Sequence, residues 1–581
     1  MEKRVLLAVV LSFLVLYGFQ AMFPPPEPPK PGAAEGQAPK AAQQSAASPA
    51  AARPVGDPPA AASPEQPAAA TLVADAAERE IVVESNAVRA TFSTRGGVLT
   101  SWRLKTYQDA SGQPLELVPQ DVPATTPRPF TLIVDDAAVS ATLSRALFKP
   151  SASSVTVSSA LEALAFDYSD ASGITAHKKF AFDPQSPYVV YVSASVTKGG
   201  SALVPSMQWG PALGTALDAS SAGYYNMPPR ALVHKAGEEE RFDATELGEI
   251  ANAQGQYDFI GVDDHYFMVT AVGLKEPAQL HYELLQLPLR EGSDKPPPPY
   301  ISWALKFSGP PMSVAYFMGP KDYDILRAIG PELTRAIDFG MFGWLVVPLL
   351  RSLKWVNTYI HNYGWSIVAL TVLINLTMFP LRHKSVVSMR RMQAIQPEIK
   401  AIQDRYAKLK LTDPARQKMN SDMMALYKER GVNPASGCVP MLLTLPVLFA
   451  FYAMLSVAIE LRGAPFFGWI TDLSRHDPLY ITPVLMGATQ FIQTKMTPST
   501  ADPTQQRIML LMPLMFMGMF LWAPSGLVVY WTVSNMWAIG QQAITNKLIG
   551  PPQERTVRPP AERRVKSAGT GRSEQASKER Q

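Results

Sequence analysis

Long apolar runs separated by polar connections dominate the C-terminal part of the chain. Five apolar segments occur there once the turn sequence Ala523-Pro524-Ser525-Gly526 is taken as a break: Trp365–Leu381, Val439–Ile459, Leu479–Met496, Ile508–Trp522 and Gly526–Leu548. A helix of about 20 apolar residues spans the hydrocarbon core of a bilayer. The pattern therefore predicts a five-helix membrane core within residues 362–548, in which the third and fourth spans are short.

Polar residues recur inside these apolar segments, where lipid offers no hydrogen-bond partner. Such residues usually face the interior of a helix bundle or a watery cavity. They are Ser366, Thr371, Asn375, Thr444, Gln490, Gln493, Ser534, Asn535, Gln541 and Gln542. Because so many occur within the spans, we expect a hydrophilic groove among the helices.

A sixth apolar run stands at the start of the chain. Val5–Phe23 follows Lys3 and Arg4 and ends directly before a run of prolines. A cleaved signal peptide is the alternative, but it would have a shorter apolar region and a small-x-small cleavage site. We therefore predict a retained transmembrane anchor over residues 1–23. The positive-inside rule places Lys3 and Arg4 in the cytoplasm, so that the following residues are exported.

The exported part divides into a linker and a folded domain. Residues 24–75 are rich in Pro, Ala, Gln and Ser and predict a disordered linker, because they hold too few large apolar residues to bury a core. Residues 76–325 alternate apolar and polar positions, most clearly at Val190, Val192, Ala194 and Val196. Short alternating runs separated by Gly-Gly and Pro-rich turns predict an all-β sandwich.

Residues 333–358 form a separate apolar and aromatic stretch. Its uninterrupted apolar core, Phe339–Leu350, is too short to span a bilayer by the usual length rule. A crossing here would also place the basic residues after Leu381 outside the cell, against the positive-inside rule. We therefore expect an amphipathic helix that lies on the outer membrane interface.

A helical hairpin is predicted at residues 383–431. Met392, Ile395, Ile399, Ile402 and Tyr406 follow heptad spacing, and Pro397 predicts a kink or a helix start nearby. The stretch 382–430 carries 12 Lys and Arg against 5 Asp and Glu, whereas residues 24–381 carry 26 against 35. The hairpin is therefore expected in the cytoplasm, and residues 549–581 are expected to form a basic, disordered cytoplasmic tail.

Composition argues against several kinds of chemistry. The chain has one cysteine among 581 residues, so no intrachain disulfide can form. It carries neither a P-loop nor a dinucleotide-binding glycine motif, and its histidines are scattered without metal-ligand spacing. We therefore predict no catalytic residues, no bound metal, no cofactor and no enzymatic activity.

Short motifs in the predicted membrane core resemble the YidC/Oxa/Alb family of membrane protein insertases, and the layout is most similar to its Gram-negative bacterial YidC members. The motifs are Met378-Phe379-Pro380-Leu381, Met423-Met424-Ala425-Leu426-Tyr427, Gly431-Val432-Asn433-Pro434, Glu460-Leu461-Arg462, Trp469-Ile470-Thr471-Asp472-Leu473, Leu485-Met486-Gly487, Pro524-Ser525-Gly526-Leu527 and Val533-Ser534-Asn535. They cover residues 360–550 densely, and the exported part matches more loosely.

The resemblance implies an insertase and chaperone that brings client transmembrane helices into the bilayer through a hydrophilic groove, alone or with the Sec translocon. It implies a multi-pass protein of the bacterial inner membrane with cytoplasmic termini, six transmembrane helices and a periplasmic β-sandwich of the galactose-mutarotase-like type. The implied partners are nascent membrane-protein clients, the Sec translocon, membrane lipids, and the ribosome through the basic tail and cytoplasmic loops.

The resemblance also implies site residues. The groove residues would be Thr371, Asn375, Thr444, Gln490, Trp531 and Ser534. The cytoplasmic contacts with client or partner would be Arg382, Lys384, Arg390 and Arg391. The family usually has an arginine in the groove at the position that Asn375 occupies here. With no Lys or Arg in the middle of another span, we expect a groove that acts by hydrogen bonding without a fixed cation.

Two other functions do not fit the sequence pattern, and a third remains open. A secondary transporter usually shows inverted repeats or more spans, and an intramembrane hydrolase needs a nucleophile and a base inside the spans. Neither pattern is detected in the sequence. A receptor-like role of the sandwich, binding sugar or peptide, remains open and is compatible with an insertase.

Overall fold

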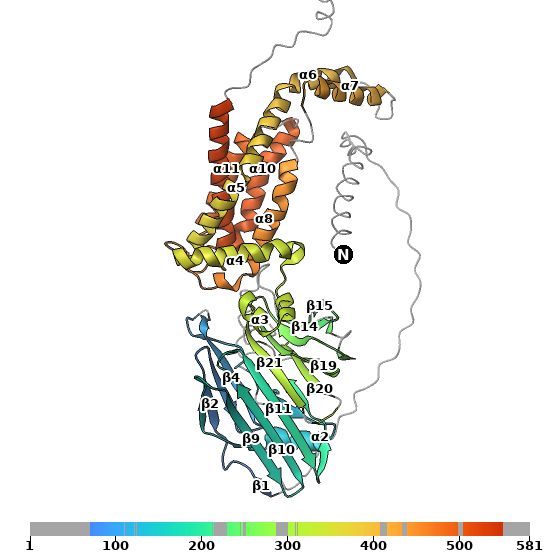
Figure 1. Ribbon diagram of the computed structural model, residues 1–581, viewed down its shortest axis with the longest axis vertical. Helices are drawn as coiled ribbons and strands as arrows, with labels where there is room; N and C mark the ends of the chain where they lie inside the picture. Colours follow the sequence, from blue (N-terminus) through green and yellow to red (C-terminus); the bar gives the residue numbers. More distant parts are fainter. Residues whose placement is uncertain are drawn as a thin grey trace, which may run out of the picture. The chain divides into compact units, whose positions relative to one another are not determined.

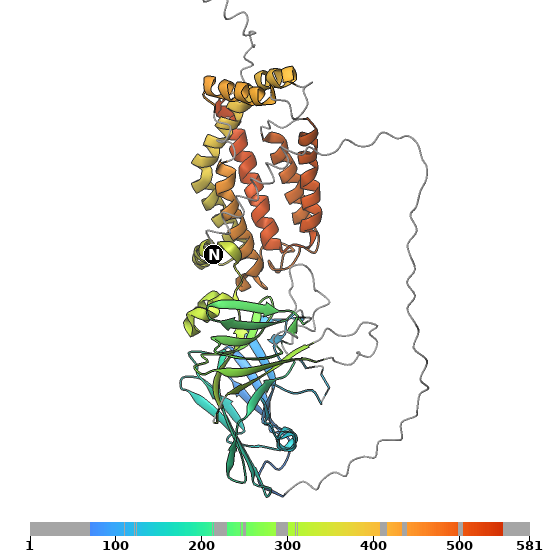
Figure 2. The same cartoon turned by 90° about the vertical axis from the view of Figure 1, so that its right-hand side faces the viewer.

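The computed structural model describes residues 70–549 apart from residues 110, 121, 124, 212, 214–228, 245, 248–250, 286–299, 308, 311, 407–414, 433–438 and 498–502. The described residues form a β-domain followed by a helical region (Figures 1 and 2). The predicted anchor 1–23, most of the linker 24–75 and nearly all of the tail 549–581 lie outside them.

The largest sheet of the β-domain has 11 strands. Its main path is β1 (Thr71–Val73), β9 (Glu162–Asp170), β10 (Ile174–Phe182), β11 (Val189–Lys198), β21 (Met312–Pro320), β18 (Phe267–Val272), β17 (Phe259–Asp263), β14 (Arg230–Lys235) and β15 (Glu238–Phe242), with β12 (Ser201–Leu203) on β11 and β7 (Lys149–Pro150) on β9. All of these pairings are antiparallel.

Two five-stranded sheets complete the domain. One has the order β16 (Asn252–Gly255), β19 (Ala278–Leu285), β20 (Tyr300–Phe307), β13 (Ser206–Trp209) and β6 (Thr131–Ile133). The other has the order β5 (Pro114–Glu116), β4 (Val98–Gln108), β3 (Val88–Ser93), β2 (Glu80–Glu84) and β8 (Ser154–Thr156). Two short helices, α2 (Ala137–Arg145) and α3 (Tyr323–Ile329), accompany the strands.

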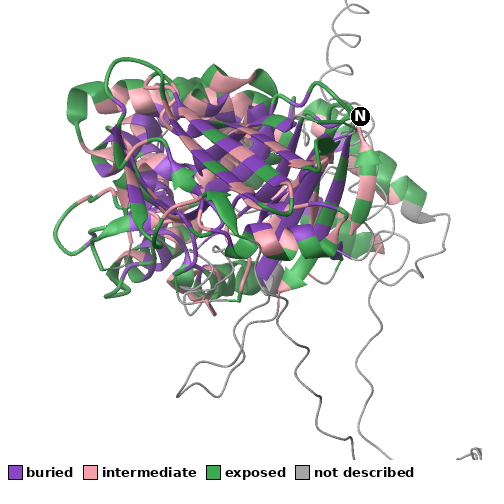
Figure 3. Ribbon diagram, turned by 90° about the horizontal axis from the view of Figure 1, so that it is seen from below, coloured by how far each residue is buried: buried purple, intermediate pink, exposed green. Residues whose placement is uncertain are grey.

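The period-two pattern explains how strands such as β10 and β11 bury one face, whereas β17 and β18 are buried on both faces. Val190, Val192, Ala194 and Val196 of β11 are all buried, which confirms the alternation predicted from the sequence. Residues from all three sheets contribute to one hydrophobic core, and buried positions concentrate on the strands in Figure 3. The first strand, β1, lies within the stretch 24–75 assigned to a linker, and its backbone pairs with β9.

The amphipathic helix is α4 (Gly343–Ile360), preceded by the 3-10 turns η3 (Pro331–Ala336) and η4 (Gly340–Phe342). Val346, Leu349, Leu350 and Leu353 are buried on one face, at the spacing of a helix packed on its neighbours. The Lys354 ammonium lies 2.6 Å from the carboxylate of Asp324 and 3.0 Å from that of Glu460, so it joins α3, α4 and the 3-10 turn η6 (Ile459–Leu461).

The helical bundle follows the predicted apolar segments closely. Its long helices run side by side in Figures 1 and 2. They are α5 (Tyr363–Ala394), α8 (Val439–Val457), α9 (Ile481–Met496), α10 (Pro503–Met519) and α11 (Ser525–Ile549), with the 3-10 turn η7 (Phe520–Trp522) between the last two. By length and composition, α5 is the one helix among the described residues that is sufficient to cross a membrane, and Leu445–Val457 and Gln506–Trp522 are shorter apolar helices.

Helix α5 differs from its prediction, and this matters for the site. The apolar run predicted a helix that ends at Leu381, but α5 continues without a break through 32 residues to Ala394. The hairpin helices α6 (Gln396–Tyr406) and α7 (Ala415–Glu429) follow, with Pro397 at the second position of α6. A small core of Ile395, Ile399, Leu426 and Val432 holds them together, and Ile395 and Ile399 are positions that the heptad spacing indicated.

Candidate functional site

A half-open cavity of about 480 Å³ lies among α5, α8, α9 and α11. Just over half of the residues around it are polar. These are Thr371, Asn375, Arg382, Ser385, Gln490, Gln493, Thr497, Ser534, Asn535, Gln541 and Gln542. The apolar and aromatic ones are Ile374, Met378, Val386, Met389, Val447, Leu448, Tyr530, Trp531 and Ala538. A cavity with this lining can hold hydrogen-bonding groups that lipid could not.

One face of α5 carries a continuous chain of polar contacts. The Thr371 hydroxyl donates to the Ile367 carbonyl at 2.6 Å, and the Asn375 amide nitrogen donates to the Thr371 carbonyl at 2.8 Å. The Arg382 guanidinium Nη1 then donates to the Asn375 side-chain oxygen at 2.8 Å. Side chains of a helix point toward its N-terminus, so the long arginine reaches back along the same face. The amide of Asn375 is thereby held from both sides.

This contact corrects the expectation of a groove without a cation. An apolar run that ends at Leu381 predicts Arg382 at the cytoplasmic surface. Since α5 continues past it, Arg382 stays on the helix face that lines the cavity. Among the lining residues that the structure describes, Arg382 carries the only formal charge.

Helices α9 and α11 supply most of the other lining residues. The Trp531 indole Nε1 donates to the Gln490 side-chain oxygen at 3.0 Å, which joins two predicted groove residues from different helices. The Trp531 ring packs edge-on against Phe520, 5.1 Å between ring centroids. Ser534 lines the same cavity one turn further along α11. Thr444 belongs to α8, but its side chain lies outside the described residues.

The four basic residues predicted for cytoplasmic contacts separate into three environments. Arg382 lines the cavity, and Arg390 is hydrogen-bonded to the Asn546 side chain of α11. Lys384 and Arg391 are exposed on α5. Of the four basic residues, only Lys384 and Arg391 are exposed, whereas Arg382 and Arg390 are partly buried.

Sequence reasoning left Gln493, Gln541 and Asn535 out of the site, although it noted them as polar residues within spans. On α11, the cavity residues Trp531, Ser534, Ala538 and Gln541 recur every three or four positions. This helical period, measured from Trp531, is the signal that could have found Gln541 and the neighbouring Asn535.

The comparisons with known proteins agree over nearly the whole chain. A family model described as "60Kd inner membrane protein" matches residues 355–552, and another described as "YidC periplasmic domain" matches residues 80–352. A membrane protein insertase YidC of Geobacter metallireducens is 38% identical, with 96% of this chain and 100% of that protein covered. The chain belongs to the YidC family of membrane protein insertases.

Other YidC relatives are similarly close. The membrane protein insertase YidC of Syntrophus aciditrophicus is 36% identical, with 94% of this chain and 100% of that protein covered. A solved structure, described as an active YidC insertase with the first transmembrane domain resolved, is 18% identical, covers 82% of this chain and 95% of its own, and has a TM-score of 0.33. The family assignment comes from the sequence relatives.

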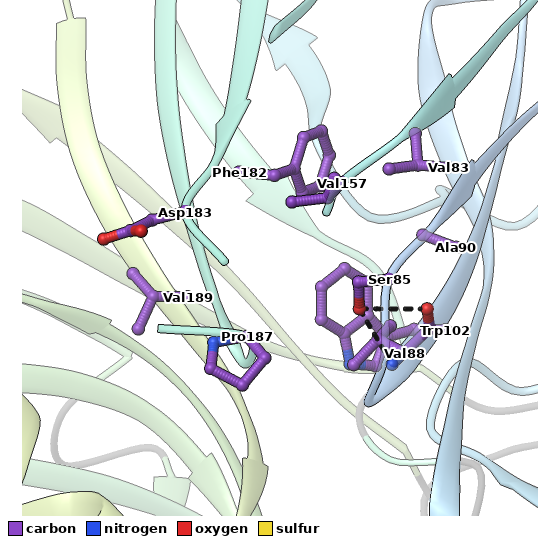
Figure 4. A pocket seen from close by; sticks show the side chains of 10 residues that line it. All are labelled: Val83, Ser85, Val88, Ala90, Trp102, Val157, Phe182, Asp183, Pro187 and Val189. Carbon is purple, nitrogen blue, oxygen red and sulfur yellow. Dashed lines mark hydrogen bonds between the residues drawn. The ribbon is translucent and has the colours of Figure 1, made fainter. Parts of the chain in front are cut away.

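The two matched regions of the YidC family divide the molecule between the β-domain and the bundle, and the cavity falls wholly in the second. A separate hollow in the matched periplasmic domain is lined by Val83, Trp102, Phe182 and their neighbours (Figure 4). Its volume of about 10 Å³ holds at most one water. Among the described residues there is also no group of three or more His, Cys, Asp or Glu placed to hold a metal. The polar cavity of the bundle is therefore the candidate site.

Proposed function

We propose that this chain inserts client transmembrane helices into the bacterial inner membrane by holding a polar segment of the client in the cavity among α5, α8, α9 and α11. A bare amide or hydroxyl that crosses hydrocarbon costs roughly 2–7 kcal/mol. Polar side chains at that depth replace the lost water and lower the barrier. The observation that carries the proposal is the cavity itself, with Thr371, Asn375 and Arg382 in one connected row.

The size of the cavity indicates which part of the client it receives. At about 480 Å³ it is comparable with a site for one drug-sized ligand. A complete transmembrane helix of 20 residues is about 30 Å long and does not fit. We therefore infer that the cavity takes a short polar stretch, while the apolar helix of the client stays in contact with lipid.

Arg382 supplies the electrostatic part of the proposal. A guanidinium keeps its charge in nearly all protein environments and binds carboxylates through paired hydrogen bonds. In surroundings less polar than water its attraction for an acidic side chain is strengthened. Its tie to Asn375 holds it at the cavity, so a client whose polar segment carries Asp or Glu is favoured.

The lengths of two helices support a shortened path through the membrane. α9 has 16 residues and α10 has 17, which correspond to about 24 and 26 Å of helix. Both lengths fall below the hydrocarbon thickness of about 30 Å, and short spans thin the bilayer around them. The client then crosses less hydrocarbon beside these helices.

The finer topology and the partners belong to the same proposal. We propose six spans, formed by residues 1–23 and the five long helices, with both termini and the hairpin α6–α7 in the cytoplasm and the β-domain in the periplasm. The basic stretch 382–430 supports this orientation. Nascent clients, membrane lipids, the Sec translocon and the ribosome are the proposed partners, and no covalent chemistry is proposed.

The test is insertion of a single-span client by the purified full-length chain in liposomes, followed by protease protection. We expect Arg382→Gln to slow a client with an acidic polar segment roughly tenfold, and Arg382→Lys to retain most of the activity. Thr377→Val is the control, because Thr377 is exposed on the same helix and is bonded only to that helix. Equal insertion by all three variants and the unmodified chain would overturn the role of Arg382. No insertion by the unmodified chain above protein-free liposomes would overturn the proposed function.

A further inference from the structure

Gln541 differs from the other amides of the cavity in its hydrogen bonding. Its side chain is only 6% exposed, and neither its Nε2 nor its Oε1 has a hydrogen-bond partner among the described residues. By contrast, Gln490 accepts from Trp531, and Asn375 is bonded on both sides. The adjacent Gln542 donates to the Asn546 side chain at 2.8 Å. Gln541 is thus a buried amide with both functions unused.

Such an arrangement is unusual because buried polar groups are nearly always paired. Replacing Gln541 by an apolar residue of similar size would remove two unsatisfied groups at once. A second unused acceptor, the Gln493 side-chain oxygen of α9, borders the same cavity. An amide with both functions unused and a second unused acceptor around one cavity indicate a ligand that supplies both donors and acceptors.

The chemistry of a carboxamide selects the class of ligand. It carries a donor and an acceptor side by side and no charge. The main chain of an extended peptide offers the same pair, one N–H and one C=O in each residue. In a membrane these main-chain groups must be satisfied unless the segment is already helical. Hydrogen bonds to the main chain also bind without regard to sequence, which suits many different clients.

We propose that Gln541, assisted by Gln493, is a docking site for the main chain of a non-helical client segment. The pairing presupposes that a client occupies the cavity, as proposed above. Neither amide atom of Gln541 is exposed in the unoccupied chain, so its amide turns about the soft outer torsion of the side chain to meet the client. Arg382 then selects charge on client side chains, whereas Gln541 holds the backbone of any client.

The experiment combines a variant of the chain with a change in the client backbone. Gln541→Met keeps the length of the side chain and removes both amide functions. Gln393→Met is the matched control, since Gln393 is exposed on α5 and does not line the cavity. The full-length chain is reconstituted in liposomes. The single-span client carries an ester in place of one backbone amide, at each position of its polar segment in turn. An ester lacks the N–H and is a weaker acceptor.

We expect the unmodified chain and Gln393→Met to insert the all-amide client at similar rates and to be slowed about fivefold by an ester at one or two positions. Gln541→Met should be about fivefold slower with the all-amide client and indifferent to the ester. It should slow acidic and neutral clients alike, unlike Arg382→Gln. These results would support main-chain docking.

Two results would overturn the inference while leaving the proposed function in place. One is insertion by Gln541→Met at the unmodified rate, which would mean that Gln541 pairs with water alone. The other is ester sensitivity in Gln541→Met equal to that of the unmodified chain. If Gln541→Met does not fold, Gln541→Asn decides, because its amide is set back by one methylene. Lost ester sensitivity in Gln541→Asn supports docking, and retained sensitivity contradicts it.

Discussion

Arg382 Nη1 donates a hydrogen bond to the side-chain oxygen of Asn375, 2.8 Å away and two helical turns earlier on α5. An arginine expected at the cytoplasmic surface therefore brings its charge to the polar row of the cavity. The contact joins a hydrogen-bonding residue and a cation in one unit, so the two should be tested together.

Replacing Asn375 with leucine should displace that cation. Without its acceptor, the Arg382 side chain has no reason to stay folded back and is free to turn toward the aqueous end of the helix. We expect Asn375→Leu to slow the insertion of a client with an acidic segment roughly tenfold and a neutral client less. Thr377→Val is the control, because Thr377 is exposed on α5 and is bonded only to its own helix. Unchanged insertion of both clients by Asn375→Leu would contradict this role.

Exchanging the two residues should preserve function. In the double variant Asn375→Arg with Arg382→Asn the cation still stands at a position that lines the cavity, although a side chain at 375 points toward the helix N-terminus and away from 382. We expect its insertion rate to stay within about threefold of the unmodified chain, whereas Arg382→Asn alone should be roughly tenfold slower. Both variants are measured in the same liposome assay with an acidic client. A double variant as slow as Arg382→Asn alone would contradict this prediction and show that the charge must stand at position 382.

Lys354 should determine how firmly α3 and η6 are held against α4. Its ammonium contacts Asp324, Glu460 and, at 3.3 Å, Asp322, and Glu460 is buried. Removing one partner of a largely buried ion pair typically costs about 3 kcal/mol. We expect Lys354→Met to speed amide hydrogen exchange in residues 322–330 and 459–461. Exchange in the strands of the β-domain should stay unchanged. Equal exchange at residues 322–330 in Lys354→Met and in the unmodified chain would refute the prediction.

Lys178 should make the β-domain more stable as the pH rises above neutral. Burial lowers the pKa of the Lys178 ammonium to about 7, although it donates to the carbonyls of Gly96, Gly97 and Phe130 at 2.7–3.0 Å. An unfolded lysine titrates near 10.4, so between about pH 7 and pH 10 the unfolded state binds more protons than the folded one. The free energy of unfolding then increases with pH, by up to about 1.4 kcal/mol per unit.

The measurement is hydrogen exchange of β10 and β11 in the full-length chain, corrected for the intrinsic pH dependence of exchange. Lys178→Met should remove the dependence on pH and loosen both strands, because three carbonyls lose their donor. Lys179→Met is the control, since Lys179 is exposed on the other face of β10. A slope that persists in Lys178→Met would assign the effect to another group.

The sequence predicts repetitive features better than contacts between distant segments. The alternation at Val190 and Val192 and the apolar run of α8 follow from periods that repeat locally, and both are confirmed. Lys178 could not be predicted as buried, because its three acceptors are 48 to 82 residues away in sequence. From the sequence alone, a charged residue in a strand is predicted to be exposed, because the groups that would pair with it inside the fold are not known.

The residues of the candidate site can likewise be predicted only where a local pattern determines their position. Thr371 and Asn375 share a helix face by simple spacing, and the structure brings both to the cavity. The position of Arg382 depends on where α5 ends, and helix ends are poorly marked when a basic residue follows an apolar run without a Gly or Asn stop signal. The pairing of Trp531 with Gln490 depends on how α9 and α11 pack, which no local pattern encodes.

The most direct test of the central claim is a photo-cross-link from the cavity to a client stalled during insertion. A photoreactive amino acid replaces Ser534, which lines the cavity, or Leu511, which is exposed on α10 outside it. The account predicts that Ser534 cross-links to the polar segment of the client and that Leu511 reaches at most its apolar helix. The contrary result is a client that still inserts while the photoreactive residue at position 534 gives no cross-links above those seen without client. It would show that the client does not pass through the cavity.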